Sequence, residues 1–256
     1  MANTYLTRTP SSASNRRTFT ISTWVKLGSL GGNTTSIFSA WYANSTVGHF
    51  VFRGSSDKFG WSQWSNDSYS TRLFRDVNGW YHVVLAVDTT QATASNRIKL
   101  YVNGVQETSF ATSVYPSLDL DLNVNTATAH WIGQYHSADF ILKSYLAEMN
   151  FVDGAAKTPA DFAETNSGTG QWIPKEYKGS YGTNGFYLPF KKATDGYSVN
   201  FRNLLSYDSS LTFPLSPGAN FYLDGDFTIE CWVKMADYTA RGGINPSILL
   251  MGSTQL

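Results

Sequence analysis

Apolar and polar residues alternate along several short segments of this chain. In residues 19–26 (FTISTWVK) the apolar side carries Phe19, Ile21 and Val25. In residues 97–102 (RIKLYV) the pattern repeats with Ile98, Leu100 and Val102. A side-chain period of two is that of a β-strand with one buried face, so each segment predicts a strand.

A second pattern is apolar without interruption. Residues 80–87 (WYHVVLAV) predict a central strand that is buried on both faces, and His82 is interpreted as a core residue within it.

Asn103-Gly104 follows residues 97–102 and predicts a tight hairpin, because a type I′ turn needs positive φ at both central positions. Residues 158–164 (TPADFAE) predict one helical turn with Thr158 as its cap. Short strands with frequent turns favour an all-β sandwich.

One phrase occurs twice. Residues 19–26 return as residues 227–234 (FTIECWVK), and a Gly-containing loop follows each copy. A repeat at domain-sized spacing indicates tandem modules rather than a short solenoid. We therefore predict a first domain over residues 1–190, a linker over 191–205, and the start of a second, incomplete module over 206–256.

Composition excludes several classes of partner. The chain has 19 basic and 19 acidic residues, and only 15% of its residues are charged. A chain without net charge has no long-range attraction for nucleic acid or for an anionic membrane surface. Neither a signal peptide nor an apolar run long enough to span a bilayer is present. The sequence predicts a soluble protein made in a cytoplasm.

The ordered motifs resemble a known fold family. They include residues 19–26, 79–84 (GWYHVV), 100–104 (LYVNG) and 145–154 (YLAEMNFVDG). In this order they are similar to the laminin-G-like, concanavalin A-like lectin/glucanase superfamily. The resemblance implies an all-β, concanavalin A-like jelly-roll sandwich of two antiparallel sheets, which restarts at about residue 206.

Three further stretches resemble the modules of this family in structural and tail-associated proteins of tailed phages. They are residues 8–18 (RTPSSASNRRT), 87–93 (VDTTQAT) and 181–188 (YGTNGFYL). The resemblance implies a virion protein, assembled in the host cytoplasm, that acts as a tail or fibre adhesin or as a decoration. Host-surface glycans and other virion proteins would be its partners. The resemblance also allows a homo-oligomer. The alternative is a free lectin-like protein.

The family also contains glycoside hydrolases, so a polysaccharide depolymerase is the third reading. Such an enzyme needs two carboxylates that face the substrate. Members commonly carry Glu-x-Asp-x-x-Glu on one strand, and that pattern is absent here. Glu148 and Asp153 are separated by an odd number of positions, which places them on opposite faces of a regular strand. We assign no catalytic residue.

Aromatic side chains are the candidate glycan contacts. Trp41 and Tyr42 follow residues 37–38 in a predicted loop. Trp61, Trp64 and Tyr69 lie among small polar residues, an arrangement suited to sugar rings and hydroxyls. Because Trp61 and Trp64 are an odd number of positions apart, one of the two would face the core of a regular strand. Core or hairpin packing is therefore the alternative for these residues.

Asp119, Asp121 and Asn123 are weak candidates for metal ligands. Together with Asn125 they alternate with apolar residues, so the alternative is the solvated face of an outer strand. The spacing differs from an EF-hand, because Val124 stands where that loop requires glycine. We predict no required cofactor, with calcium left open because laminin-G-like domains often bind it.

Overall fold

The computed structural model describes residues 5–31, 34–42, 46–53, 56–63, 66–135 and 140–190. The chain divides into two compact units, Met1–Asp195 and Gly196–Leu256. The predicted linker and second module lie outside the described residues and remain predictions. No helix in the described ranges is long and apolar enough to cross a bilayer.

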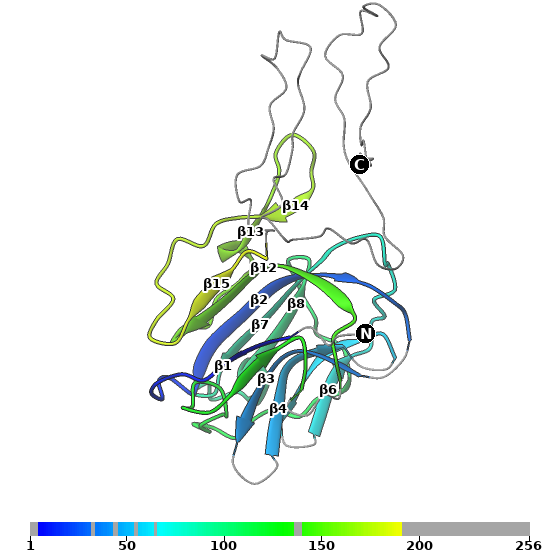
Figure 1. The fold of residues 1–256 in the computed structure, drawn as a ribbon. Helices are drawn as coiled ribbons and strands as arrows, with labels where there is room; N and C mark the ends of the chain where they lie inside the picture. Colours follow the sequence, from blue (N-terminus) through cyan, green and yellow to red (C-terminus); the bar gives the residue numbers. More distant parts are fainter. Residues whose placement is uncertain are drawn as a thin grey trace, which may run out of the picture. The chain divides into compact units, whose positions relative to one another are not determined.

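Within the described residues, two antiparallel sheets make up the sandwich (Figure 1). Sheet I has the strand order β1-β11-β3-β4-β5-β6-β10. Its strands are β1 (Leu6–Arg8), β3 (Thr35–Tyr42), β4 (Thr46–Arg53), β5 (Phe59–Gln63), β6 (Asn66–Ser70), β10 (Phe110–Thr112) and β11 (His130–Ile132).

Sheet II has the strand order β15-β12-β2-β7-β8-β9. Its strands are β2 (Thr18–Leu27), β7 (Tyr81–Asp88), β8 (Ile98–Val102), β9 (Val105–Gln106), β12 (Ser144–Asp153) and β15 (Phe186–Leu188). The short 3₁₀ turn η1 (Ala94–Asn96) precedes β8. The all-β, concanavalin A-like sandwich predicted from the sequence is confirmed.

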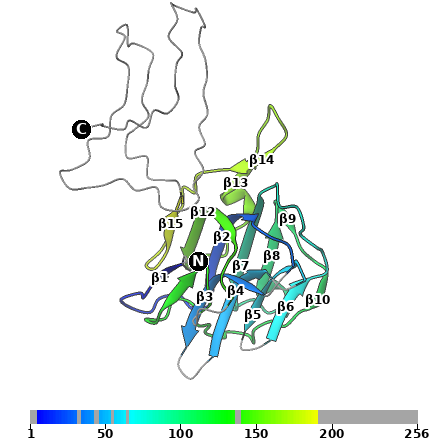
Figure 2. The same ribbon diagram turned by 45° about the vertical axis from the view of Figure 1, so that its right-hand side comes forward.

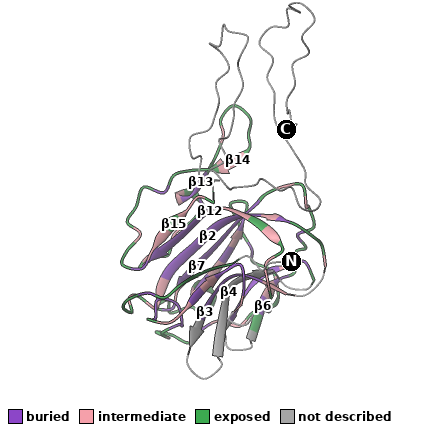
Figure 3. Ribbon diagram, in the orientation of Figure 1, coloured by how far each residue is buried: buried purple, intermediate pink, exposed green. Residues whose placement is uncertain are grey.

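Alternation along sheet II divides its residues between two cores. Phe19 and Ile21 of β2 and Leu85 of β7 point into the main core between the sheets. Val84 of β7 and Val152 of β12 point to the outer face, where they join a second, smaller core. Both faces of β7 are thus buried, as the continuous apolar run predicts, and Figure 3 shows β2 and β7 buried along most of their length.

Residues 155–182 pack on the outer face of sheet II, and we call this segment the cover. It contains η2 (Pro159–Asp161) and the ribbon of β13 (Ala163–Thr165) and β14 (Trp172–Pro174), which lies close to sheet II in Figure 2. Phe162 and Tyr177 of the cover complete the second core. The predicted turn is confirmed as η2, with Thr158 and Asp161 forming a reciprocal capping box.

Two local backbone features follow from the sequence. Asn103 and Gly104 have φ of +51° and +82°, and they join β8 to β9 as the predicted tight hairpin. Glu148 has φ of +50°, inside a register shift of β12 between Ala147 and Asn150. A bulge at this point re-aims the side chains of β12 between its two halves.

Candidate functional site

A pocket of about 280 Å³ opens where the two sheets end at the same edge of the sandwich. Its residues come from β1, β3 and β11 of sheet I and from β12 and β15 of sheet II. Phe38, Phe151, Phe186, Ile132 and Leu188 supply most of its apolar wall. The pocket exists because β1 and β15 are short edge strands that leave this side of the core uncovered.

Aromatic rings in contact give this wall its shape. The Phe151 ring lies 5.5 Å from the Phe38 ring and 5.5 Å from the Phe186 ring, measured between centroids. His130 lies 6.0 Å from Phe38. Each ring is held by a strand whose alternation points it inward, so the wall is fixed by the sheet register.

Asn125 is the most deeply buried of the polar residues that line this pocket. It is 0% exposed, and its backbone φ is +62°. Its side-chain amide donates to the Asp153 carboxylate at 2.8 Å and to the carbonyl of Asn15. With both N–H groups engaged, Oδ1 must be the remaining acceptor, and it has no hydrogen-bond partner. A buried acceptor without a partner carries a desolvation cost.

Asn184 ties the loops around the pocket together. Its backbone N–H donates to Asp153 Oδ2 at 3.0 Å. Its side-chain amide donates to the carbonyl of Ser12 and to the Ser14 hydroxyl, at 3.0 and 2.7 Å. The Asp153 carboxylate is therefore held by amide donors on both oxygens, which fixes it in the wall rather than offering it to a ligand.

His130 is neutral and fully engaged. Nδ1–H donates to the carbonyl of Thr128 at 2.8 Å, and Nε2 accepts from the backbone N–H of Asn125 at 3.1 Å. Burial is the main reason that the pKa of His130 is lowered to about 4. The ring therefore positions Asn125 and has no nitrogen left for a ligand.

Arg8 is the one charged residue that lines the pocket among the described residues. It is exposed, and its guanidinium donates to the carbonyl of Asn184 at 2.9 Å. The guanidinium carbon lies 5.6 Å from the centre of the Phe186 ring. Within the described part of the chain no carboxylate pairs with it, so its other N–H groups remain available.

Glu148 and Asp153, the two carboxylates considered for catalysis, make separate contacts. Asp153 lies beside the pocket, whereas Glu148 accepts a hydrogen bond from the Tyr187 hydroxyl. Tyr187 alternates with the pocket-lining Phe186 and Leu188, so it points away from the pocket. Burial and this hydrogen bond raise the pKa of Tyr187.

Of the five predicted aromatic contacts, the structure describes the side chains of Trp61 and Tyr69. Trp61 is 1% exposed, and its indole N–H donates to the carbonyl of Val114 at 3.1 Å, so it is a core residue rather than an exposed sugar platform. The loop predicted for Trp41 and Tyr42 is wrong, because both end strand β3 and pair with β4. Tyr69 is a half-buried residue of β6, with the Lys58 ammonium 5.3 Å from its ring. Trp64 lies outside the described residues.

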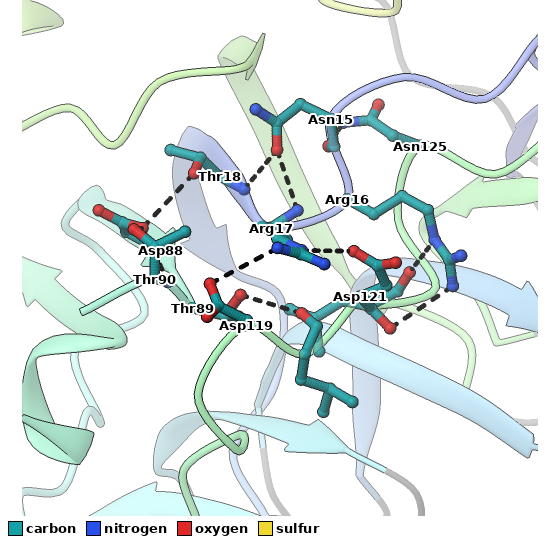
Figure 4. A network of polar contacts seen from close by, with 12 residues as sticks. Asn15, Arg16, Arg17, Thr18, Asp88, Thr89, Thr90, Asp119, Asp121 and Asn125 are labelled. Atoms are coloured by element: carbon teal, nitrogen blue, oxygen red, sulfur yellow. Dashed lines mark hydrogen bonds and ion pairs between the residues drawn. The ribbon is translucent and has the colours of Figure 1, made fainter. Parts of the chain in front are cut away.

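The predicted polar cluster is a loop, not a strand (Figure 4). Asp119 and Asp121 form ion pairs with Arg17 at 3.5 and 2.7 Å, and these pairs raise the pKa of Arg17. Asn123 is buried, at 4% exposure. Asp119 has φ of +57°, which an extended strand excludes, so the outer-strand reading is wrong. The described residues hold no group of three or more metal-ligating His, Cys, Asp or Glu side chains.

Sequence reasoning missed Arg8, Asn125 and Asn184 as members of one site. All three fall in stretches that the sequence analysis names for other reasons: residues 8–18, the polar alternation that ends at Asn125, and residues 181–188. A signal was present at Asn125, because asparagine tolerates positive φ better than most residues. Their convergence was not readable, since Arg8 and Asn184 are 176 positions apart.

Three solved structures are similar to this chain at low sequence identity. A putative carbohydrate-binding protein from Bacteroides ovatus is 15% identical, with 60% of this chain and 42% of that chain covered and a TM-score of 0.41. A heptameric SAP-like pentraxin from Limulus polyphemus is 16% identical, with 61% and 72% covered and a TM-score of 0.41. A sialidase from Trypanosoma rangeli is 13% identical, with 56% and 21% covered and a TM-score of 0.42.

This chain thus spans a minor part of the sialidase and less than half of the Bacteroides protein. Similarities this low carry no ligand or activity over to it. Comparison with curated proteins gave no match. The family model of the concanavalin A-like lectin/glucanases superfamily matches residues 2–161, which is more than half of the 256 residues. The chain belongs to the concanavalin A-like lectin/glucanase superfamily.

Proposed function

We propose that this protein is a non-enzymatic carbohydrate-binding module whose ligand enters the pocket between β1 and β15. The observation that carries the proposal is the pocket itself, with aromatic walls and the exposed Arg8 guanidinium, which no carboxylate of the described residues pairs with. Sugars present C–H faces to aromatic rings and hydroxyls to a few fixed polar groups. Membership of a lectin and glucanase superfamily supports the same ligand class.

A binding role fits the pocket better than hydrolysis does. Glycoside hydrolases generally place two carboxyl groups about 5–10 Å apart across the scissile bond. No Asp or Glu is among the described residues that line this pocket. The depolymerase therefore remains the less favoured alternative, and reducing-end release from a polysaccharide would revive it.

The setting that we propose is the surface of a phage particle, in line with the resemblance of residues 8–18, 87–93 and 181–188. Copies on one particle would bind host-surface glycans together, so that weak single contacts gain strength through effective concentration. Other virion proteins, or further copies of this chain, would hold the module in place. Mass spectrometry of purified particles tests this setting, and absence of the chain from them would contradict it.

A matched pair of variants tests the pocket. Leu6 lines it from the edge strand β1, and Val105 lies on the edge strand β9 of the other sheet; both are exposed, at 45% and 62%. Leu6→Trp should obstruct the pocket and abolish binding on a glycan array, whereas Val105→Trp should bind like the parent protein. A silent array for the parent protein would overturn the carbohydrate function. Equal binding by both variants would overturn the pocket as its site.

A further inference from the structure

Arg8 is the charged group that a ligand of the pocket can reach. The residue is exposed and lines the pocket, and its guanidinium carbon lies 5.6 Å from the centre of the Phe186 ring in the wall. No Asp or Glu is among the described residues that line the pocket. The charge that the pocket offers to a ligand is therefore positive.

The guanidinium is held in place before any ligand arrives. Its Nη1 donates to the carbonyl of Asn184 at 2.9 Å, and it lies over the Phe186 ring. The backbone of Arg8 is fixed as well, because β1 pairs with β11 and places Arg8 opposite His130. A side chain that is already ordered loses less conformational entropy on binding than a free surface arginine does.

One edge of this guanidinium has no hydrogen bond to the described residues. The bond to Asn184 uses Nη1, which leaves Nε–H and Nη2–H for a further acceptor. These two donors lie along the same edge of a rigid fork, whose spacing matches the two oxygens of a carboxylate. A carboxylate also brings one negative charge to a pocket that is lined by one cation.

Asp153, the carboxylate beside the wall, does not take this role from a ligand. It is 7% exposed, and its two oxygens accept from the side-chain amide of Asn125 and the backbone N–H of Asn184. The ion pairs between described residues do not include one from Asp153 to Arg8. Arg8 thus keeps its free edge for a group from outside the protein.

The common classes of sugar suit this arrangement unequally. A neutral sugar can place a C–H face on Phe186, but it leaves the free edge of Arg8 to water. An amino sugar would bring its ammonium toward the guanidinium, and the two like charges would repel each other. A uronic acid suits both groups, because its carboxylate is attached directly to a ring with apolar C–H faces.

We propose that the pocket selects a carboxylate-bearing sugar, such as a uronic acid, whose carboxylate pairs with Nε–H and Nη2–H of Arg8 while its ring packs against Phe186. The inference rests on the carbohydrate-binding function proposed above and names its ligand class. A dry cavity of roughly 150 Å³ holds a benzene molecule. The pocket, at about 280 Å³, therefore has room for one sugar ring, and hydroxyls on the outer side of that ring stay in water.

The experiment compares four small probes on the full chain by NMR titration. Methyl β-D-glucuronide carries the carboxylate, and methyl β-D-glucoside has a hydroxymethyl group in its place. Methyl β-D-glucoside 6-sulfate carries a tetrahedral anion, and cyclohexanecarboxylate keeps the carboxylate on a ring without hydroxyls. We expect the glucuronide to bind at least about tenfold more tightly than the glucoside, because hydrogen bonds between two charged groups are the stronger ones.

Three variants locate the effect. Arg8→Gln should remove the preference for the glucuronide over the glucoside, since the charged fork is lost. Arg8→Lys should keep part of that preference, because the charge stays and the planar pair of donors does not. Lys178→Gln removes the same charge from an exposed residue that does not line the pocket, and it should keep the full preference. Equal loss in Arg8→Gln and Lys178→Gln would mean general electrostatic attraction and would overturn the role of Arg8.

The outcomes separate the inference from the function on which it rests. Equal binding of the glucoside and the glucuronide, lost in Leu6→Trp, would keep the carbohydrate function and overturn the selection of an acid. Binding of the 6-sulfate as tight as that of the glucuronide would overturn the carboxylate. Binding of cyclohexanecarboxylate as tight as that of the glucuronide would keep the Arg8 site and overturn the carbohydrate function. No binding of any probe would overturn both.

Discussion

The outer face of sheet II and the pocket edge each bury a histidine, but the two histidines have different kinds of hydrogen-bond partner. His82, under the cover, is 0% exposed and His130, at the edge, is 7% exposed. His82 donates from Nε2 to the Ser22 hydroxyl at 2.8 Å and accepts at Nδ1 from the Trp172 indole N–H at 3.1 Å. Its ring also stacks on Trp24 at 5.0 Å.

The partners of His130 are backbone groups, and one of them belongs to Asn125 with its unmatched oxygen. On the covered face, side chains from distant segments meet and fill the space between them. At the edge, short strands leave part of the core uncovered, and a cavity remains. Among the described residues, each region holds one buried polar atom without a partner, Trp24 Nε1 beside His82 and Asn125 Oδ1 at the edge. The comparison indicates that side chains fill the space on the covered face, whereas a cavity remains at the pocket edge.

Acidification should affect both regions at once and give the largest change. Burial lowers the pKa of His82 and of His130 to about 4, against about 6.5 in an unfolded chain. The unfolded state therefore binds protons first as pH falls, so stability is complete above pH 6.5 and declines between there and pH 4. Each histidine contributes on the order of 3 kcal/mol to this loss. Urea titrations across the window measure it, and a flat free energy of unfolding would contradict it.

Equivalent truncations should then separate the two regions. Phe162 is 1% exposed in the second core, so Phe162→Ala should lower the free energy of unfolding by about 4 kcal/mol. Phe186 is half-buried and already borders an open pocket, so Phe186→Ala should cost about 1.5 kcal/mol. Urea denaturation measures both. Equal costs would mean that the pocket edge is packed as densely as the covered face.

The smallest effect should come from a single hydrogen bond under the cover. Trp172→Phe removes the donor to His82 Nδ1 and should cost about 1 kcal/mol. Trp80→Phe is the control, because Trp80 is 40% exposed and has no hydrogen bond to the described residues. We expect no measurable change for it in the same urea titration. A cost as large in the control would show that the indole surface, not its N–H, matters at residue 172.

Much of the fold was predictable because its signals are local. The alternation of residues 19–26, the continuous run of 80–87 and the Asn103-Gly104 turn each fix a nearby structure, and all three are confirmed. The alternation over residues 118–125 misled because Leu122 and Val124 do reach the core, although from a loop held by Arg17 rather than from a strand. Period alone does not distinguish the two.

The site was less predictable because it depends on distant convergence. Trp61 has the composition of a sugar contact, but the register of β5 buries it. Asn125 is held in the pocket wall by Asp153 and His130, which come from the strands β12 and β11. No local pattern encodes which polar group will be left without a partner.

The hydrogen bonds that Asn184 makes to the N-terminal segment also determine when the pocket can form on a nascent chain. The bonds to Arg8 and Ser12 join residues 176 and 172 positions apart. Contacts that close such long loops form late in folding. A ribosome releases residue 184 after both sheets have most of their strands, so a nascent chain can pair β2 with β7 well before the pocket exists. Ligand capture would therefore begin only after nearly the whole domain has left the ribosome.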